Sequence, residues 1–488
     1  MNILFVTSEI HPLIKTGGLA DVSRSLPLAL HQAGADIRVL VPGYPALMAR
    51  LTEPCQALPL APTLIRSPAQ LLHTTLPGTP LPLLILDCPA LFDRPGSSPY
   101  QTPEGSDWWD NALRFGALAR VAQHLCTTPL LPHWPVEVLH CNDWQSALAP
   151  ALLALQGHPT FPTLLTIHNL AFQGNFNPLW LSRLGLPLQA FHPEALEFHG
   201  QLSFLKAGLR FAQRITTVSP RYAQEIQSAH FGCGLEGLLH QRQGDLTGIL
   251  NGIDPEWHPR QDPLIPHPYD RSNLAPKAAN KAALQQQLGL TPEPQAMLVG
   301  MVTRLTHQKG IDLVLERLEQ WMQHPVQWVI LGSGDGATEQ RLRALSGRFP
   351  GRLSVTLAFS EPLAHLIIAG SDVLLMPSRF EPCGLTQLYA MAYGTLPLVH
   401  RTGGLADTVL DEADKAQPAA TGFCFDEPSA DALAGTFLRA LECFTQPERW
   451  RALQLNGMSR DSSWDHAAQE YLSIYRAMAP LAATLTAR

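Results

Sequence analysis

The chain has 488 residues, and at about 150 residues per domain this length predicts two or three domains and excludes a single small binding module. Hydrophobic residues make up 45% of the sequence and charged residues 15%, which predicts large folded cores and little disorder. The formal net charge is −7 and no basic run interrupts the sequence, so we expect no nucleic-acid partner.

The cysteines contain no C-x-x-C pair and no closely spaced Cys/His set, so we expect reduced thiols and no zinc site. They are Cys55, Cys88, Cys126, Cys141, Cys233, Cys383, Cys424 and Cys443. Residues 1–9 lack the basic region of a signal peptide, and no stretch of about 18 apolar residues is free of charge and proline. We therefore expect a cytoplasmic protein that has no membrane partner.

In the first half of the chain, short apolar runs bounded by turn residues predict buried strands at 3–7, 37–41, 83–87, 136–140, 163–167 and 215–218. Helix-length stretches, such as 112–125 and 203–211, lie between several of these runs. The alternation favours parallel strands joined by crossover helices on both faces of a sheet.

The same pattern restarts in the second half. Strands are predicted at 297–302, 328–331, 353–357, 373–376 and 396–399, with helices at 311–322 and 386–393 among them. The sequence therefore predicts an α/β fold of two doubly wound, Rossmann-like domains. A proline-rich stretch at 255–276 separates the two sets, and we expect the hinge close to Asn251.

The hexapeptide TGGLAD occurs twice, at 16–21 and at 402–407, each time after a predicted strand and before a helical stretch. Paired glycines in this position let backbone N–H groups approach an anion at the carboxyl end of a parallel sheet. Each copy is therefore either a ligand loop or a tight turn without a ligand.

The first copy has Lys15 before it and Asp21 at its end, and a nucleotide sugar would satisfy both charges. A dinucleotide cofactor is the alternative. However, no G-x-G-x-x-G motif follows the strand at 3–7, and the strand at 37–41 is followed by Pro42 and Gly43 rather than by an acid that could hold a ribose. These absences argue against hydride transfer.

Two segments of the second half carry polar groups after strands. Arg304 and Lys309 lie on one loop and could clamp a diphosphate, although an arginine and a lysine at a helix start are often merely solvated. The segment 377–386 places Glu381, Cys383 and Gly384 between a hydrophobic strand and a helix. A buried acid needs partners, so we favour a functional role for Glu381 in holding sugar hydroxyls.

In the first half, the segments 140–144 and 166–170 also end strands with polar groups. They contain Asp143 and His168 and lie where a cleft is expected. A lone histidine at a strand end is more often structural than catalytic, so His168 by itself is a weak signal.

Taken together, these segments resemble bacterial glycogen synthases and plant starch synthases, and the resemblance runs from residue 1 to about 464. It is carried by KTGGLADV at 15–22, HNLAFQG at 168–174, TVSP at 217–220, LNGID at 250–254, RLTHQKG at 304–310, SRFEPCGLT at 378–386 and RTGGLADTV at 401–409. The resemblance implies a GT-B glycosyltransferase that moves glucose from ADP-glucose to an α-1,4-glucan with retention of configuration.

The resemblance also implies domain limits and residue roles. An acceptor-side domain would comprise 1–248 joined by 466–488, and a nucleotide-sugar domain 249–465, with the catalytic cleft between them. Arg304 and Lys309 would hold the diphosphate, and His168 and Glu381 would serve catalysis. The remaining residues expected to bind ADP-glucose are Lys15, Gly17, Gly18, Asp21, Asn251, Phe359, Cys383, Gly384, Leu385 and Thr386, of which Phe359 would stack on adenine. Asp143 and Trp144 would lie on the glucan side.

Some positions depart from the family pattern. Asn142 stands where many members have His, Phe359 where the adenine-stacking residue is commonly Tyr, and Trp108 and Trp109 precede a site where Tyr and Thr are frequent. Tyr389 replaces a second glutamate found in broader retaining GT-B enzymes.

No D-x-D-like carboxylate pair accompanies Arg304 and Lys309, so we expect neither a metal nor another cofactor. The alternatives are a synthase that prefers UDP-glucose and a catalytically silent glucan-binding protein on the same fold.

Overall fold

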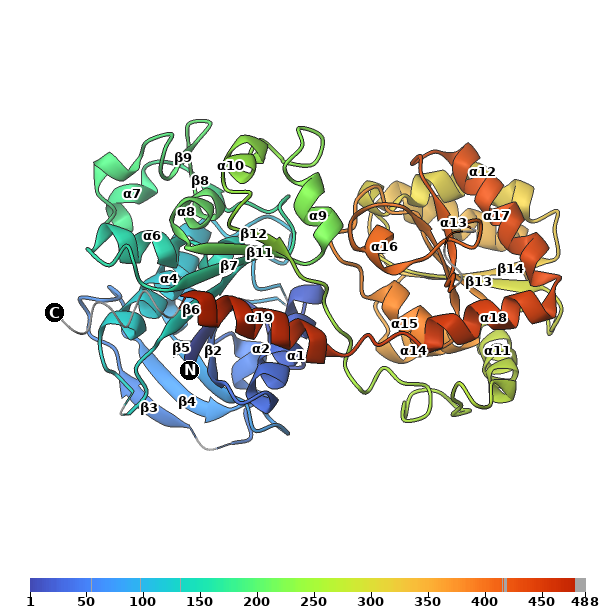
Figure 1. The fold of residues 1–488 in the computed structure, drawn as a ribbon, viewed down its shortest axis with the longest axis horizontal. Helices are drawn as coiled ribbons and strands as arrows, with labels where there is room; N and C mark the ends of the chain where they lie inside the picture. Colours follow the sequence, from blue (N-terminus) through green and yellow to red (C-terminus); the bar gives the residue numbers. More distant parts are fainter. Residues whose placement is uncertain (54, 97, 132, 415, 417–418, 479–488) are drawn as a thin grey trace. The chain divides into compact units, whose positions relative to one another are not determined.

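The computed structural model describes residues 1–478 except 54, 97, 132, 415 and 417–418. The chain divides into two units, which are coloured along the sequence in Figure 1. Among the described residues, the first unit comprises Met1–Gly252 and Trp464–Met478, and the second comprises Ile253–Ser463. The expected limits were 248 and 466 for the first unit. Of the expected returning segment 466–488, residues 479–488 lie outside the described residues.

The described part of the first unit contains a nine-stranded sheet with the order β12-β11-β7-β6-β1-β2-β5-β4-β3. Its strands are β1 (Asn2–Val6), β2 (Asp36–Pro42), β3 (Gln56–Pro59), β4 (Gln70–Thr75), β5 (Pro82–Asp87), β6 (Val138–Asn142), β7 (Thr163–Ile167), β11 (Arg214–Thr217) and β12 (Leu246–Gly248). The six strands predicted in this half are confirmed, with ends shifted by at most two residues.

The predicted strands pair with one another in parallel, but the sheet also has an antiparallel side that was not predicted. β4 pairs antiparallel with both β3 and β5, whereas β1, β2, β5, β6, β7, β11 and β12 pair in parallel. Antiparallel strands need no crossover helix, and a short turn closed by Leu76 N–H donating to the Leu81 carbonyl joins β4 to β5. Prolines at Pro59 and Pro82 weaken the strand signal of this region, which suits an edge.

The helices of the first unit cover both faces of its sheet. They are α1 (Gly18–Gln32), α2 (Pro45–Met48), α3 (Pro89–Phe92), α4 (Asn111–Thr127), α5 (Asp143–Ser146), α6 (Leu148–Leu155), α7 (Trp180–Arg183), α8 (Phe204–Phe211), α9 (Pro220–Glu225), α10 (Glu236–Gln241) and α19 (Trp464–Met478), with a 3₁₀ turn at Leu188–Ala190. A small sheet of β8 (Asn175–Phe176), β10 (Gln201–Ser203) and β9 (Glu197–Phe198) lies beside them. Ser203, which we predicted inside a helix, caps α8 instead, because its hydroxyl accepts the Lys206 N–H at 3.2 Å.

The second unit contains a six-stranded parallel sheet in the order β15-β14-β13-β16-β17-β18 among the residues described. Its strands are β13 (Met297–Val302), β14 (Val326–Leu331), β15 (Leu353–Thr356), β16 (Val373–Met376), β17 (Leu396–His400) and β18 (Phe423–Phe425). The five predicted strands are confirmed within two residues, and β18, which is three residues long, was not predicted.

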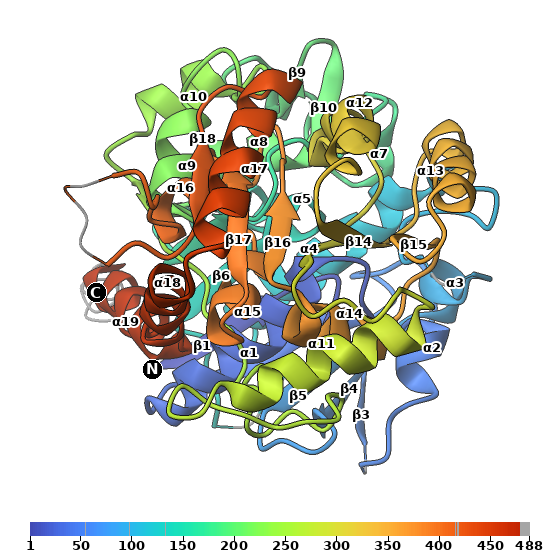
Figure 2. The same cartoon turned by 90° about the vertical axis from the view of Figure 1, so that its right-hand side faces the viewer.

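Helices pack on both faces of this sheet, as Figure 2 shows, with α12 and α17 on one side and α11 and α14 on the other. Alternate residues of β13 point to the two cores, because Met297, Val299 and Met301 join one cluster and Leu298 the other. The helices are α11 (Ala275–Gln287), α12 (Ile311–Trp321), α13 (Gly336–Arg348), α14 (Glu361–Gly370), α15 (Thr386–Ala392), α16 (Gly403–Thr408), α17 (Ala430–Phe444) and α18 (Pro447–Met458), with a 3₁₀ turn at His307–Lys309. The two predicted doubly wound domains are therefore confirmed.

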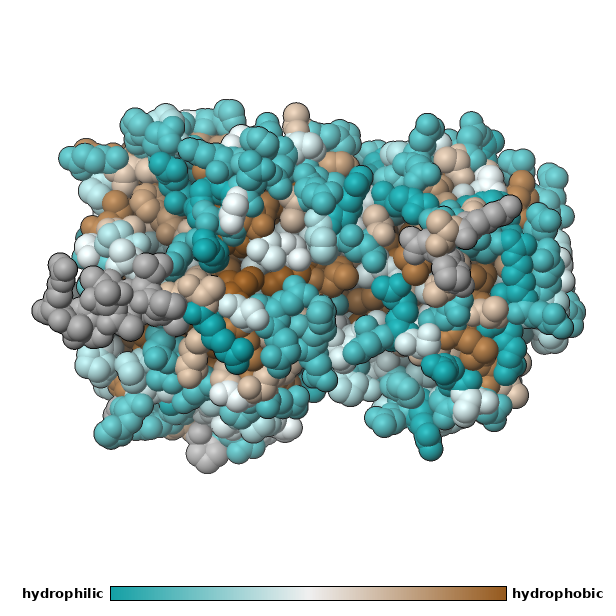
Figure 3. Space-filling view, viewed as in Figure 1, coloured by the Kyte–Doolittle hydropathy of each residue, from teal (hydrophilic) through white to brown (hydrophobic). Residues whose placement is uncertain are grey.

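In the described residues, every helix is too short or too polar to cross a lipid bilayer. The face drawn in Figure 3 is mainly hydrophilic on both units.

Candidate functional site

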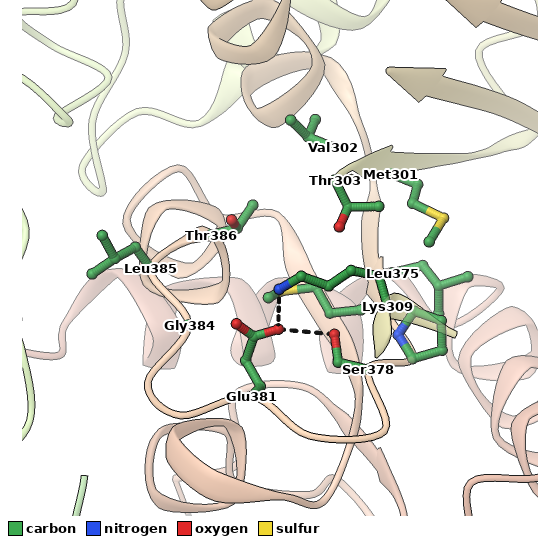
Figure 4. Close-up of a pocket in the computed structure, with 12 residues that line it drawn as sticks. Met301, Val302, Thr303, Lys309, Leu375, Ser378, Glu381, Gly384, Leu385 and Thr386 are labelled. Atoms are coloured by element: carbon green, nitrogen blue, oxygen red, sulfur yellow. Dashed lines mark hydrogen bonds and ion pairs between the residues drawn. The ribbon is translucent and has the colours of Figure 1, made fainter. Parts of the chain in front are cut away.

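A small pocket opens in the second unit, where β13 and β16 end. Figure 4 shows that the loop after β13 supplies Thr303 and Lys309, and the loop after β16 supplies Ser378 and Glu381. Gly384, Leu385 and Thr386, at the start of α15, also line the pocket. The carboxyl ends of parallel strands are the usual place for a ligand in an open α/β sheet.

The centre of this pocket is an ion pair between Lys309 and Glu381. Lys309 Nζ lies 2.5 Å from Glu381 Oε2, and the Ser378 hydroxyl donates to the same oxygen at 2.9 Å (Figure 4). Both charged side chains are largely buried, so each would be costly without the other. The pocket therefore holds a positive and a negative group side by side, as a ligand with phosphates and hydroxyls requires.

Backbone geometry brings these two loops together. Gly310, which follows Lys309, has φ of 68°, and a Cβ atom there would lie 2.0 Å from the Pro377 carbonyl oxygen. A side chain is therefore excluded at Gly310 by both conformation and space. The loop after β13 can consequently lie directly on the loop after β16, and this contact places Lys309 against Glu381.

Other predicted residues of the second unit lie elsewhere. Arg304 is exposed, and its side chain makes no hydrogen bond or ion pair within the described part of the chain. Phe359 follows β15, is 81% exposed and is not part of the pocket wall. Cys383 is buried next to the wall without lining it. The structure therefore gathers Lys309, Glu381 and residues 384–386, but leaves Arg304 and Phe359 at the surface.

The second TGGLAD copy lies directly on the segment that carries Glu381. A Cβ atom on Gly403 would lie 2.0 Å from the Glu381 carbonyl oxygen, and one on Gly404 would lie 2.0 Å from the Cys383 carbonyl oxygen. The Gly404 N–H donates to the Glu381 carbonyl at 3.1 Å. These glycines therefore pack against the segment that carries Glu381, and they support the pocket from behind.

The first TGGLAD copy is more open. Gly17 precedes α1, Gly18 begins it, and a Cβ atom on Gly17 would meet nothing within 4 Å. Lys15 Nζ binds Asp21 Oδ1 at 2.7 Å, so these two charges satisfy each other in the absence of a ligand.

Glu9, a residue that we did not predict, anchors this loop. Its buried carboxylate accepts the Thr16 N–H at 2.5 Å and the Thr16 hydroxyl at 2.6 Å, and it also accepts the Tyr100 hydroxyl. Burial raises the pKa of Glu9 above its ordinary value. The sequence feature that could have identified Glu9 is the position of this acid just after the predicted strand at 3–7.

His168 follows β7 and is held by Asn142, the last residue of β6, and Asp143, the first residue of α5. Its backbone N–H donates to Asp143 Oδ1 at 2.7 Å, and its Nε2 lies 2.9 Å from Asn142 Oδ1. Because the Asn142 amide group donates to the Val6 carbonyl at 3.0 Å, its oxygen faces His168, and we assign the imidazole proton to Nε2. The ring therefore keeps Nδ1 as an acceptor.

Burial determines the protonation states of His168 and Asp143. It lowers the pKa of His168 to about 3, so the imidazole is neutral at physiological pH. Burial also raises the pKa of Asp143 to about 7, although the backbone N–H groups of His168 and Asn169 favour its charged form. Asn142 was noted in the sequence as a departure, but its contact with His168 could not be foreseen without the order of β1, β6 and β7.

The last predicted residues of the first unit are Trp144 and Asn251. Trp144 is 9% exposed and packs against Phe115 and Phe176, with ring centroids 4.9 and 5.7 Å away. Asn251 is buried, and its Oδ1 has no hydrogen-bond partner among the described residues. An unsatisfied buried oxygen is unusual and suits a residue that meets a ligand. Within the same residues, no group of three or more His, Cys, Asp or Glu side chains could hold a metal ion.

Comparisons with known families agree with this arrangement of two units. The family described as the starch synthase catalytic domain matches residues 2–241, and the family described as glycosyl transferases group 1 matches residues 285–453.

Similar proteins match over nearly the whole chain. The glycogen synthase 1 of Methylococcus capsulatus is 49% identical over 98% of this chain and 96% of its own, and the glycogen synthase of Nitrosospira multiformis is 48% identical over 97% of both. The solved catalytic domain of starch synthase IV from Arabidopsis thaliana, bound to ADP and acarbose, has a TM-score of 0.88 and 29% identity, and the match covers 98% of this chain and 99% of that one. The chain therefore belongs to the glycogen and starch synthase family, and it is a glycosyltransferase with the GT-B fold.

Proposed function

We propose that this protein is a glycogen synthase that transfers glucose from ADP-glucose to the non-reducing 4-OH of an α-1,4-glucan with retention of configuration. The observation that carries the proposal is the Lys309–Glu381 pair in the pocket at the ends of β13 and β16. Support also comes from the similar starch synthase, whose structure is described as bound to ADP and acarbose.

The donor site follows from the charges in this pocket. An entering diphosphate would compete for the Lys309 ammonium, and the exposed Arg304, which belongs to the same loop, would bind a second phosphate oxygen. The Glu381 carboxylate and the Ser378 hydroxyl would then remain to bind the hydroxyl groups of the glucose. As ADP leaves, the two cations would stabilise the negative charge that develops on the phosphate.

The first unit offers no free carboxylate for attack on the anomeric carbon among the residues that we predicted there. Asp21 is paired with Lys15, and Asp143 accepts the backbone N–H of His168. A double displacement needs a carboxylate on the face opposite the leaving group. We therefore propose a front-face route, in which the departing phosphate takes the proton of the acceptor hydroxyl and no glucosyl-enzyme forms.

His168 would stabilise the positively charged sugar in the transition state of this route. Its imidazole is neutral, so it adds no repulsion, and its Nδ1 keeps a lone pair. Replacing His168 by Ala should therefore lower kcat more than it raises KM.

The test is incorporation of ¹⁴C-labelled glucose from ADP-glucose into glycogen by the purified protein, with UDP-glucose assayed beside it. A preference for UDP-glucose would change the donor, and no incorporation from either would favour a silent glucan-binding protein. NMR should show an α-linked product, and mass spectrometry of quenched enzyme should show no glucosyl adduct. A β-linked product or a stable adduct on Asp21 or Asp143 would overturn the stereochemical part of the proposal.

The proposed donor site draws its positive charge from Lys309 and Arg304, so we expect no requirement for a divalent metal. Activity should persist in EDTA. Loss of most activity in EDTA that Mg²⁺ or Mn²⁺ restores would contradict this expectation.

A further inference from the structure

Two tryptophans of the first unit lie together at its surface. Trp109, just before α4, is 70% exposed, and its ring centroid lies 6.0 Å from that of Trp180, the first residue of α7. The two ring planes are inclined by 32°. Trp180 is partly buried against the core of the unit, whereas Trp109 is mostly exposed. Large aromatic side chains usually bury most of their surface, so the exposed indole of Trp109 calls for an explanation.

The segments that carry the two tryptophans are fixed by contacts with the rest of the unit. The residue after Trp109 is Asp110, whose buried carboxylate binds Arg94 at 2.7 Å. On the other side, α7 packs on α4, because the Arg120 guanidinium donates to the Leu184 carbonyl and the Leu184 side chain lies over Gly116. The two tryptophans therefore form a preorganised surface.

The surroundings of the pair are polar but nearly balanced in charge. The Arg183 guanidinium lies 5.0 Å from the Trp180 ring centroid, and Asp107 and Asn177 are exposed on the neighbouring segments. Indole faces bind the C–H faces of pyranose rings, while such polar side chains can bind sugar hydroxyls. Because the flanking charges are of both signs, the surface suits a neutral carbohydrate better than a polyanion.

The pair is also continuous with the loop that carries His168. That loop runs on through Phe172, which is 53% exposed, to Phe176, whose ring lies 5.7 Å from that of Trp144, and reaches Trp180 four residues later. Trp144 itself is 9% exposed, so little of its ring is open to a glucan, whereas Trp109 is 70% exposed and Trp180 is partly exposed beside it.

We propose that Trp109 and Trp180 form a platform that binds glucose units of an α-glucan away from the end that reacts. This proposal rests on the proposed function, because it takes the α-glucan acceptor as the occupant. Such a platform would keep a long, branched acceptor near the enzyme between transfers, since binding at a second point raises the effective concentration of its chain ends.

The test is affinity electrophoresis of the full-length protein in native gels with and without glycogen. Trp109→Ala and Trp180→Ala should each reduce the retardation by glycogen at least threefold, and Trp109→Phe, which keeps an aromatic ring, should retain most of it. Leu188→Ala, at an equally exposed residue of 77%, and Leu438→Ala, on the second unit, serve as controls and should migrate like the wild type.

Steady-state kinetic constants give a second measurement, which distinguishes loss of glycogen binding from a general structural defect. In both alanine variants KM for glycogen should rise several-fold, while KM for ADP-glucose and the turnover of maltotriose stay unchanged. A thermal unfolding midpoint equal to that of the wild type shows that the variants are folded.

Four results separate the possibilities. Unchanged retardation of the Trp109→Ala/Trp180→Ala double variant, or a wild type that glycogen does not retard, overturns the platform. If sedimentation shows instead that the wild type self-associates and the double variant does not, the pair is an interface between two copies and the platform is again overturned. If glycogen retards the wild type through these tryptophans but no glucose is incorporated, the platform stands and the proposed function fails.

Discussion

Lys309 and Glu381 neutralise each other in the structure. Removing one of them therefore has two effects on the pocket: it deletes one charge and leaves the opposite charge without its partner. Lys309→Ala removes a cation from the proposed diphosphate site and leaves the Glu381 carboxylate buried with Ser378 alone. Charge-assisted hydrogen bonds are worth about 1.5–3 kcal/mol, so we expect kcat/KM for ADP-glucose to fall about tenfold to a hundredfold.

The control is Arg317→Ala, which breaks an ion pair with the exposed Asp431 on the same unit and should leave both kinetic constants unchanged. Steady-state assays with varied ADP-glucose give the comparison. Equal constants for Lys309→Ala and the wild type would exclude Lys309 from the donor site.

Asp143 is buried and accepts the backbone N–H of His168. Its titration should therefore change the free energy of unfolding with pH. Its folded-state pKa is raised to about 7 from an ordinary value of 3.8. Between pH 3.8 and about pH 7, the Asp143 carboxyl group is ionised in the unfolded chain and protonated in the folded protein. The stability that Asp143 contributes is therefore complete below about pH 4 and is lost as the pH rises to about 7.

Asp143→Asn should remove this dependence, because an amide oxygen can accept the same His168 N–H and does not titrate. We expect the variant to gain stability relative to the wild type on going from pH 5.5 to pH 8, as measured by urea denaturation. Asp431→Asn, at an exposed position, should show no such gain. A difference between Asp143→Asn and the wild type that is equal at both pH values would contradict the assignment.

At the scale of elements, the two TGGLAD copies have the same sequence and different surroundings. Gly404→Ala would bring a Cβ atom against the Cys383 carbonyl and displace the segment that carries Glu381. We expect this variant to be less stable than the wild type and to bind ADP-glucose more weakly. Urea denaturation and the KM for ADP-glucose measure the two effects.

Two other glycines serve as matched controls. Gly435 lies inside α17 with open space around it, so Gly435→Ala should be neutral or stabilising by about 0.5–1 kcal/mol. Gly17→Ala has the same open space and an extended backbone, and should leave the stability unchanged. Equal stability of Gly404→Ala and Gly17→Ala would show that the two copies are equivalent after all.

Most elements of both sheets could be predicted, because their strands are continuous apolar runs and their helices begin at recognisable residues. β3, β4, β12 and β18 were not predicted, since β3 and β4 are the last two strands on one side of their sheet and lie near prolines, and β12 and β18 are each three residues long. The sequence motifs that contain the site residues could be recognised, but the contacts between those residues could not be predicted. The bond between Asn142 and His168 depends on the pairing of β6 with β7, and that of Glu9 with Tyr100 joins residues 91 apart in the sequence.

At the scale of the whole molecule, the chain leaves the first unit at Gly252 and returns to it at Trp464. The returning helix α19 packs on α1, and the Tyr475 hydroxyl lies 2.7 Å from Nδ1 of the buried His140 in β6. The other ring nitrogen of His140 lies 2.7 Å from the Thr166 hydroxyl in β7. A core in the first unit is therefore completed by residues synthesised after the whole second unit.

This path predicts that one hydroxyl near the chain end stabilises a strand 335 residues away. Tyr475→Phe leaves a buried ring nitrogen of His140 without its partner, which costs about 1–3 kcal/mol, so urea should unfold the first unit at a lower concentration. The matched control is Tyr44→Phe, because the buried Tyr44 hydroxyl has no partner among the described residues and its loss should cost nothing. Hydrogen exchange should be faster at the β6 and β7 amides of Tyr475→Phe and unchanged in β13 and β16. Equal effects of the two substitutions, or faster exchange in the second unit, would show that the chain end does not stabilise the first unit through His140.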